Sequence, residues 1–390
     1  MFREFLDLGH ARSFRKTILP LSIVFFVYTF GWGLTSSMFS IFINNSVKSL
    51  FLTGIILSLT TLMGVFLNLP FGIIESKLNI KRVLQITLLA YAVIAILYSV
   101  SNSFVALLSI SIFRGIASSF LWLTSWAYVF NYSSRKIRGK ETGFFSDMND
   151  MASAIAPILG GFSVLLFFVL PFYLLSVTSF ISFILVSVFI KEVPKRSKTN
   201  IRSQFRLIKK YFRNMRFIKT ISSVVIFYAL INVYYSFISI FLNNKGLSIP
   251  IIGTLLTISL FFAVALEVPI GNFIDTHGVR KTLMVAAAVA ASAGIAMVFL
   301  NALVYLIPVI TIFSIAYTMI FIALYSRMSD IMLKDKTQMT GAIATFKDLG
   351  YTIGPLVTGF VMVFLGVNTT FLLTGISFVA LIPIAYTLND

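Results

Sequence analysis

Several ionisable residues lie inside long apolar runs of the chain, and five of them are the residues best suited to chemistry. They are Arg114, Asp147, Asp150, Glu267 and Asp348. A charged side chain in a bilayer is costly unless it faces protein or water, so each one suggests a function. A carboxylate in a partly dry cavity can bind a proton from one face of a membrane and release it at the other. We therefore interpret Asp147, Asp150, Asp348 and Arg114 as candidates for proton coupling or transport. A fixed ion pair of Arg114 with an aspartate, or a wet position near the inner surface, is the alternative.

The elements that must position these residues are membrane helices. Of 390 residues, 58% are hydrophobic and only 11% are charged. The mean hydropathy is +0.96, whereas about a quarter of the residues in a soluble domain are charged. Such a chain can expose its apolar surface only to lipid. We expect an all-α membrane protein.

Long apolar runs recur along the whole chain. A bilayer core about 30 Å thick needs roughly 20 apolar residues in helical form. On this scale we predict twelve spans, near 17–43, 50–74, 83–100, 104–131, 142–166, 169–190, 218–242, 250–274, 282–300, 303–332, 339–365 and 370–388.

Lys and Arg are distributed very unevenly between the two sets of loops. Nearly all of the 31 basic residues lie before the first span or after an even-numbered span, whereas the other loops hold only Lys48 and Lys245. Because cytoplasmic loops carry the basic excess, both termini are predicted to be cytoplasmic, in a multi-pass protein of the plasma membrane. The same placement explains the net charge of +18 without nucleic acid as a partner.

A basic segment divides the predicted spans into six and six. We predict an N-terminal bundle over 1–190, a cytoplasmic linker over 191–217 and a C-terminal bundle over 218–390. Within the linker, apolar residues at three-to-four spacing alternate with basic ones. This pattern favours an amphipathic helix on the inner leaflet, with partner binding as the alternative.

The two halves contain an internal duplication. The segment 40–45, SIFINN, matches 239–244, SIFLNN, at an offset of 199, and Pro70 then meets Pro269. By the fifth span the offset is 198, where Asp150 meets Asp348. Because each half has six spans, the copies insert with the same orientation. The repeat therefore predicts two six-helix bundles related by a parallel pseudo-twofold axis, with a central cavity between them.

A turn motif follows the eighth span and has a second copy after the second span. It contains Gly271, Asp275, Gly278, Arg280 and Lys281, and resembles the loop signature of the major facilitator superfamily. The first-half copy keeps Gly72, Glu75, Lys81 and Arg82 but has Ser76 and Asn79 in place of the expected Asp and Gly. In that family the loop is a conformational latch, which the resemblance implies for these residues and for the nearby Glu267. A loop that merely sets topology is the alternative.

Small residues follow a common spacing in the fifth and eleventh spans. They are Gly143, Pro157 and Gly161 in one, and Gly341, Gly350, Gly354 and Pro355 in the other. The spacing is similar to the family's antiporter motif, which favours export, although generic helix packing also explains small residues in lipid. The resemblance further implies a cavity lined by the first, fourth, seventh and tenth helices. The cavity candidates are Trp32, Trp122, Trp126, Asn232 and Tyr234.

The remaining residues limit the function. The chain has no Cys, and its two histidines, His10 and His277, lie outside the apolar runs, so no metal site or cofactor is indicated. We find no nucleophile–base set in the sequence, so we do not expect an enzyme. We expect a monomeric secondary transporter that exports an amphiphilic small molecule in exchange for protons. The alternatives are an uptake permease for a nutrient or metabolite, working as symporter or uniporter, and a non-transporting receptor or assembly protein on the same fold.

Overall fold

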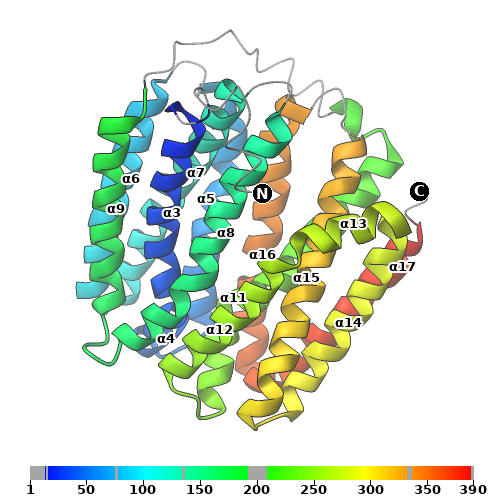
Figure 1. Ribbon diagram of the computed structural model, residues 1–390. Helices are drawn as coiled ribbons and strands as arrows, with labels where there is room; N and C mark the ends of the chain where they lie inside the picture. The colour runs from blue at the N-terminus through cyan, green and yellow to red at the C-terminus, as the bar shows by residue number, and fades with distance from the viewer. Residues whose placement is uncertain are drawn as a thin grey trace.

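The computed structural model is a bundle of long α-helices. It describes residues 14, 16–74, 78–133, 137–191, 209–331 and 336–387, and no strand occurs among them. The helices of the first half lie on one side of the bundle, in blue to green, and most of those of the second half lie on the other (Figure 1).

Seven helices are described in the first half. They are α3 (Ile18–Thr35), α4 (Phe39–Val47), α5 (Leu50–Ile74), α6 (Ile80–Val100), α7 (Phe104–Tyr132), α8 (Arg138–Ser163) and α9 (Leu170–Phe189). The second half consists of α11 (Met215–Asn244), α12 (Ile249–Ala265), α13 (Glu267–His277), α14 (Val279–Phe299), α15 (Leu303–Ile331), α16 (Lys336–Ser377), the 3₁₀ turn η2 (Phe378–Ala380) and α17 (Leu381–Thr387).

The predicted spans correspond to these helices, with three differences in detail. Among the described residues, nine helices are long and apolar enough to cross a membrane, or ten if the bent pair α12 and α13 is one span. The helix α8 is not among them, because it carries charged and polar residues along its first half. The helix α16 contains the predicted span 339–365 and the first part of the span 370–388, with a kink at Gly366, where φ is +74°, and the last span continues through η2 and α17. The first span is broken between α3 and α4.

The predicted linker over 191–217 lies mostly outside the described residues. Its end is nevertheless visible, because α11 already begins at Met215. The Asn214 side chain accepts a hydrogen bond from the Arg216 backbone N–H, which caps the free donors of the first turn. The domain boundaries themselves stay a prediction.

The turns α4–α5 and α11–α12 lie at the end of the bundle that is lower in Figure 1, which we name the outer end. Lys245 anchors the second of these turns. Its Nζ donates hydrogen bonds to the carbonyl oxygens of Val298 and Leu300 at 2.8 Å each, beside the end of α14. Burial lowers the pKa of Lys245. The other end of the bundle is the inner end, at which α3 begins and α5 finishes.

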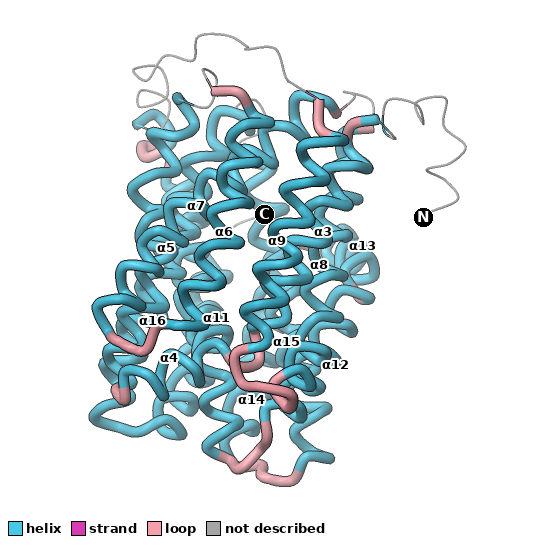
Figure 2. The backbone as a smooth tube through the Cα atoms, turned by 90° about the vertical axis from the view of Figure 1, so that its left-hand side faces the viewer, coloured by secondary structure: helices cyan, strands magenta, loops and turns pink. Residues whose placement is uncertain are grey.

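Two extensive helix pairs join the halves, α5 with α16 and α8 with α12, and α4 makes a smaller contact with α11. Figure 2 shows α5 and α16 side by side along one face. Both pairs make close contact at the outer end through small residues. A Cβ at Gly54 would overlap the Pro355 carbonyl oxygen of the other half, and one at Gly253 would overlap that of Pro157. The halves are therefore closed against each other at the outer end.

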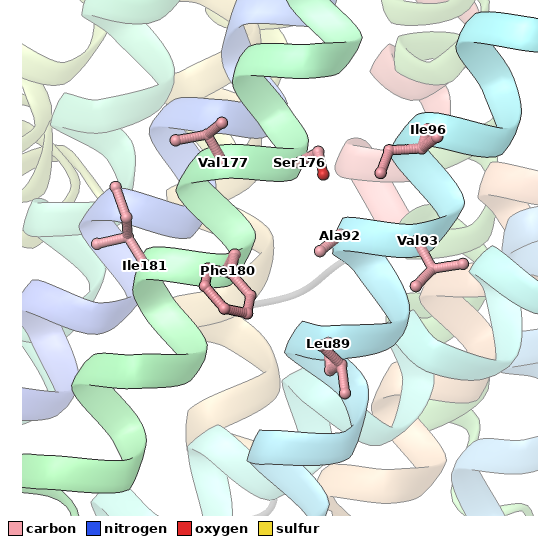
Figure 3. A pocket seen from close by; sticks show the side chains of 8 residues that line it. All are labelled: Leu89, Ala92, Val93, Ile96, Ser176, Val177, Phe180 and Ile181. Atoms are coloured by element: carbon pink, nitrogen blue, oxygen red, sulfur yellow. The ribbon is translucent and has the colours of Figure 1, made fainter.

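The outward-facing surface of the bundle is strongly apolar. Figure 3 shows a shallow pocket of about 370 Å³ between α6 and α9, lined by Leu89, Ala92, Val93, Ile96, Ser176, Val177, Phe180 and Ile181. Its lining suits lipid chains.

Candidate functional site

Asp348 of α16 lies in the interface with α5 and is hydrogen-bonded across it. Asn68 of α5 donates from Nδ2 to Asp348 Oδ2 at 2.8 Å, and the Asn68 side chain is only 3% exposed. One turn further on, Thr352 Oγ1 donates to Thr61 Oγ1 at 3.0 Å. A Cβ at Gly64 would overlap the Asp348 carboxylate, so glycine at this position leaves room for the carboxylate as it is placed here. Asn68 and Asp348 form a polar clamp between the halves.

Asp150 of α8 lies on the helix that forms the other interface, and it interacts electrostatically with Glu267 at the start of α13. Asp150 Oδ2 accepts a hydrogen bond from Ser146 Oγ at 3.2 Å. Glu267 interacts electrostatically with Asp150 and, more weakly, with Asp147. Tyr317 of α15 is within electrostatic range of both Asp150 and Glu267. Two carboxylates that face one another repel when both are ionised, whereas one shared proton turns the repulsion into a hydrogen bond.

The internal repeat relates these two arrangements. The offset of 199 that pairs Pro70 with Pro269 also pairs Asn68 with Glu267, and the offset of 198 pairs Asp348 with Asp150. The pseudo-twofold axis thus relates the Asn68–Asp348 clamp to the Glu267–Asp150 pair. From the sequence, Glu267 was predicted to belong to the conformational latch, and Asn68 was not among the candidate residues. The signal was present, since both residues stand two positions before the matched prolines.

The shapes of the two interfaces differ at the inner end. The axes of α12 and α13 meet at 47°, and α13 packs against α14 and α15 of its own half. A Cβ at Gly341 of α16 would lie 3.3 Å from the Asn68 carbonyl oxygen, but one at the equivalent Gly143 of α8 would meet nothing within 4 Å. The α5–α16 contact therefore continues past the clamp, whereas α8 is open at Gly143.

The small-residue motif divides in the same way. Gly161 packs against Pro250 and Gly253 of α12. Gly350 and Gly354 pack against the backbone of α11, where a Cβ would overlap carbonyl oxygens of that helix. Gly271, which belongs to the turn motif instead, is also open, because a Cβ there would meet nothing within 4 Å. The motif residues toward the outer end of α8 thus lie in helix contacts, and Gly143 does not.

The basic residues of the two loop motifs are engaged within their own halves. Lys81 Nζ donates to the Ser187 carbonyl oxygen near the end of α9 at 2.8 Å. Arg280, its equivalent by the offset of 199, lies with its guanidinium carbon 4.0 Å from the ring centroid of Tyr386 in α17. Arg82, Asp275 and Lys281 are exposed, and Gly278 has the positive φ of +81° that favours glycine. Glu75, and the surroundings of Gly72, lie outside the described residues. The latch role stays a prediction.

The predicted cavity aromatics have several different surroundings. Trp122 packs against Phe25, and Trp126 against Phe145, with ring centroids 5.4 and 5.2 Å apart. Tyr234 is buried against Phe313. Each of these three side chains therefore packs against an aromatic ring of its own half.

Asn232 donates from Nδ2 to the Tyr351 carbonyl oxygen at 2.5 Å, joining α11 to α16. Beside it on α11, Tyr235 is 41% exposed and donates to the hydroxyl of Tyr317. The pair Tyr235 and Tyr317 thus offers an accessible aromatic surface next to the Glu267–Asp150 pair.

Arg114 of α7 is buried among aromatic rings. Its guanidinium carbon lies 4.6 Å from the ring centroid of Trp32 and 4.9 Å from that of Phe39. Its Nε and Nη2 donate to Thr60 Oγ1 at 3.0 and 2.5 Å. Within the described part of the chain, none of its contacts is to a carboxylate, so the alternative of a fixed ion pair with an aspartate has no support in this geometry.

Comparison with known proteins gives the family. A model described as Major Facilitator Superfamily matches residues 21–248 and 220–390. The chain belongs to the major facilitator superfamily. The predicted fold class and family are thereby confirmed, and the chain is a multi-pass membrane transporter of a small molecule rather than an enzyme. Among the described residues, no group of three His, Cys, Asp or Glu side chains could hold a metal ion.

Distant relatives with drug-resistance names are similar over most of the chain. The quinolone resistance protein NorA of Staphylococcus aureus is 23% identical over 355 residues, 88% of this chain and 89% of its own. Multidrug resistance protein 2 of Bacillus subtilis is 21% identical over 316 residues, 79% and 78% of the two chains. The crystal structure of the nucleoside transporter NupG superposes with a TM-score of 0.78 at 14% identity, covering 95% of this chain and 98% of that one.

Proposed function

We propose that this transporter exports amphiphilic small molecules in exchange for protons. The observation that carries the proposal is the Glu267–Asp150 pair at the junction of α8 with α12 and α13. Support also comes from the names of the two drug-resistance relatives and from the exposed Tyr235 beside the pair.

The charge state of the Glu267–Asp150 pair can couple proton movement to substrate movement. Closing the inner end must bring α13 toward α8, and two ionised carboxylates oppose that approach. A proton on either group removes the repulsion and allows a carboxyl–carboxylate hydrogen bond. This bond would correspond to the one that Asn68 donates to Asp348.

A cationic group on a substrate removes the same repulsion as a proton. The empty, doubly ionised pair therefore holds the inner end open, and each passage between the two access states needs one occupant. Because proton and substrate then use the same pair of carboxylates in turn, their movements are coupled in opposite directions. The aromatic rings of Tyr235 and Tyr317 would contact the apolar body of the substrate and its cation.

The test is proton movement in everted membrane vesicles that carry an imposed pH gradient, followed with a pH-sensitive dye. The compounds are a lipophilic cation such as tetraphenylphosphonium, a sugar and an organic anion. We expect the lipophilic cation to dissipate the gradient in vesicles with the wild-type chain. The double variant Asp150→Asn/Glu267→Gln should not respond.

Asp348→Asn is the matched control, because an amide at position 348 still accepts a hydrogen bond from Asn68. It should keep the response to the cation. Failure of every compound to move protons would overturn the proposal, and a response to sugar alone would favour an uptake permease.

A further inference from the structure

The aromatic surroundings of Arg114 leave a buried cation without an anionic partner. The side chain is 6% exposed and lies in the middle third of α7. Buried charges in proteins are normally paired, because removal from water is costly. Intramembrane Arg residues normally pair with carboxylates or face a water-filled cavity. The contacts described for Arg114 are to the hydroxyl of Thr60 and to rings alone.

One arm of the guanidinium is also unsatisfied. Nε and Nη2 share a single acceptor, Thr60 Oγ1, while Nη1 is buried without a hydrogen-bond partner. A guanidinium is built to hold a planar carboxylate through two parallel N–H donors. The local geometry thus provides a donor fork that the protein's own groups fill only in part.

The rings around the fork indicate what else the ligand carries. Trp32 and Phe39 lie near the guanidinium carbon, and Tyr98 is 5.9 Å away. Such an apolar enclosure disfavours a doubly charged phosphate, which needs more donors than one Arg and one Thr supply. It favours a singly charged group attached to an apolar body.

The fork lies close to accessible surface. Trp32 and Thr60, which both contact the guanidinium, are only partly buried. These residues come from helices with different neighbours. The helix α3 packs against α8 and α9, whereas α5 packs against α7 and α16.

We propose that Arg114, with Thr60 and Trp32, binds the carboxylate of an amphiphilic organic acid. The inference rests on the proposed function and refines it, because it states that accepted substrates include molecules with a carboxylate. The Arg114 N–H groups donate to the two carboxylate oxygens in place of Thr60 alone, and the apolar body of the ligand stacks on Trp32.

Trp32 can report ligand binding by its fluorescence. The chain has three Trp residues, so replacing Trp122 and Trp126 makes Trp32 the only fluorescent Trp. The test uses the full-length Trp122→Phe/Trp126→Phe chain, purified in a non-ionic detergent. Its Trp emission is titrated with phenylacetate and, separately, with the neutral isostere phenylacetamide. We expect a saturable change with phenylacetate and at least tenfold weaker binding of the amide.

Two variants in that background examine Arg114. Arg114→Gln should remove the preference for the acid, while Arg114→Lys keeps the charge, loses the fork and should bind phenylacetate several-fold more weakly. Arg216→Gln, an exposed residue at the start of α11, is the matched control and should titrate like its parent. If Arg114→Gln does not fold, as judged by size-exclusion chromatography, the comparison of phenylacetate with phenylacetamide in the parent chain still tests the proposal.

Equal affinity for acid and amide would overturn the proposal. So would full competition by chloride, since Arg114 would then hold an inorganic anion, and so would unchanged phenylacetate binding in a folded Arg114→Gln chain. These outcomes are separate from the vesicle experiment. Binding without proton movement would refute antiport alone, and antiport without acid selectivity would refute the Arg114 site alone.

Discussion

At the scale of single residues, one amide–carboxylate substitution distinguishes the two interfaces between the halves. Asn68 can donate to Asp348 at any pH, because an amide does not titrate. Its counterpart Glu267 can donate to Asp150 only when protonated. The same backbone arrangement thus gives a permanent clamp on one side and a proton-dependent contact on the other.

The permanent clamp should contribute measurably to stability. Asp348→Ala leaves the buried Asn68 amide without its acceptor, which costs about 1–3 kcal/mol. We expect a clearly lower apparent melting temperature of the purified protein, followed by intrinsic fluorescence. Asp348→Asn keeps an acceptor oxygen and should lose much less. An alanine variant that melts with the wild type would show that the bond adds nothing to stability.

The proton-dependent contact should become independent of pH when Glu267 resembles Asn68. Glu267→Gln provides a permanent amide donor to Asp150, so the inner end can close without a proton. We expect the purified variant to bind tetraphenylphosphonium at least tenfold more weakly, since only the Asp150 carboxylate of the pair remains. The remaining binding should vary less with pH between 5 and 8 than in the wild type. A pH profile that matches the wild type would assign the titration to another group.

At the scale of helices, similar prolines have different effects. Pro269 cannot donate to the Ala265 carbonyl oxygen, and its ring crowds that group, which accounts for the break at Leu266. Its repeat partner Pro70 stands inside the continuous helix α5. The two helices differ in their support: α5 packs extensively against α16 of the other half, whereas the main contacts of α13 are with α14 and α15 of its own half. The chain can therefore bend where the partner helix is absent.

Gly143 is the place to test whether α13 moves toward α8. Gly143→Leu should leave folding and the melting temperature unchanged, because a side chain there meets open space. It should reduce transport at least tenfold by obstructing closure. Gly139→Leu, also open and one turn earlier, should transport normally. Normal transport by Gly143→Leu would indicate that the inner end closes elsewhere.

Hydropathy located the helices well, because each must supply about 20 apolar residues to lipid. It could not predict the bend at Leu266, which depends on how α13 is packed. Nor could it predict the surroundings of Arg114, since Trp32, Phe39, Thr60 and Tyr98 come from four different helices. The repeat offset was enough to pair Asn68 with Glu267. Only the structure shows that Asn68 bonds to Asp348 of the opposite half and that Glu267 interacts electrostatically with Asp150 of the opposite half.

At the scale of the whole molecule, the halves are closed at the outer end and held together along α5–α16. We propose that α8 and α13 approach and separate to close and open the inner end. In the turn motifs, Lys81 and Arg280 contact α9 and α17 of their own halves. Those contacts are compatible with an open inner end, because neither residue ties one half to the other.

Cross-linking can measure this asymmetry directly, because the chain has no native Cys to remove. The pair Gly143→Cys/Val268→Cys examines the α8–α13 interface, and Gly341→Cys/Leu69→Cys examines the equivalent positions on α16 and α5. A short bismaleimide should join the second pair under all conditions, since Gly341 already approaches the Asn68 backbone.

The first pair should react only when Glu267 and Asp150 are neutralised, by acidic pH or by a bound lipophilic cation. Its yield should therefore rise as pH falls, and at neutral pH it should rise on addition of tetraphenylphosphonium. Equal and constant yields from both pairs would contradict an asymmetric gate. A yield that responds to the cation but not to pH would contradict proton coupling. It would instead indicate a facilitator in which the substrate alone drives closure at this single interface.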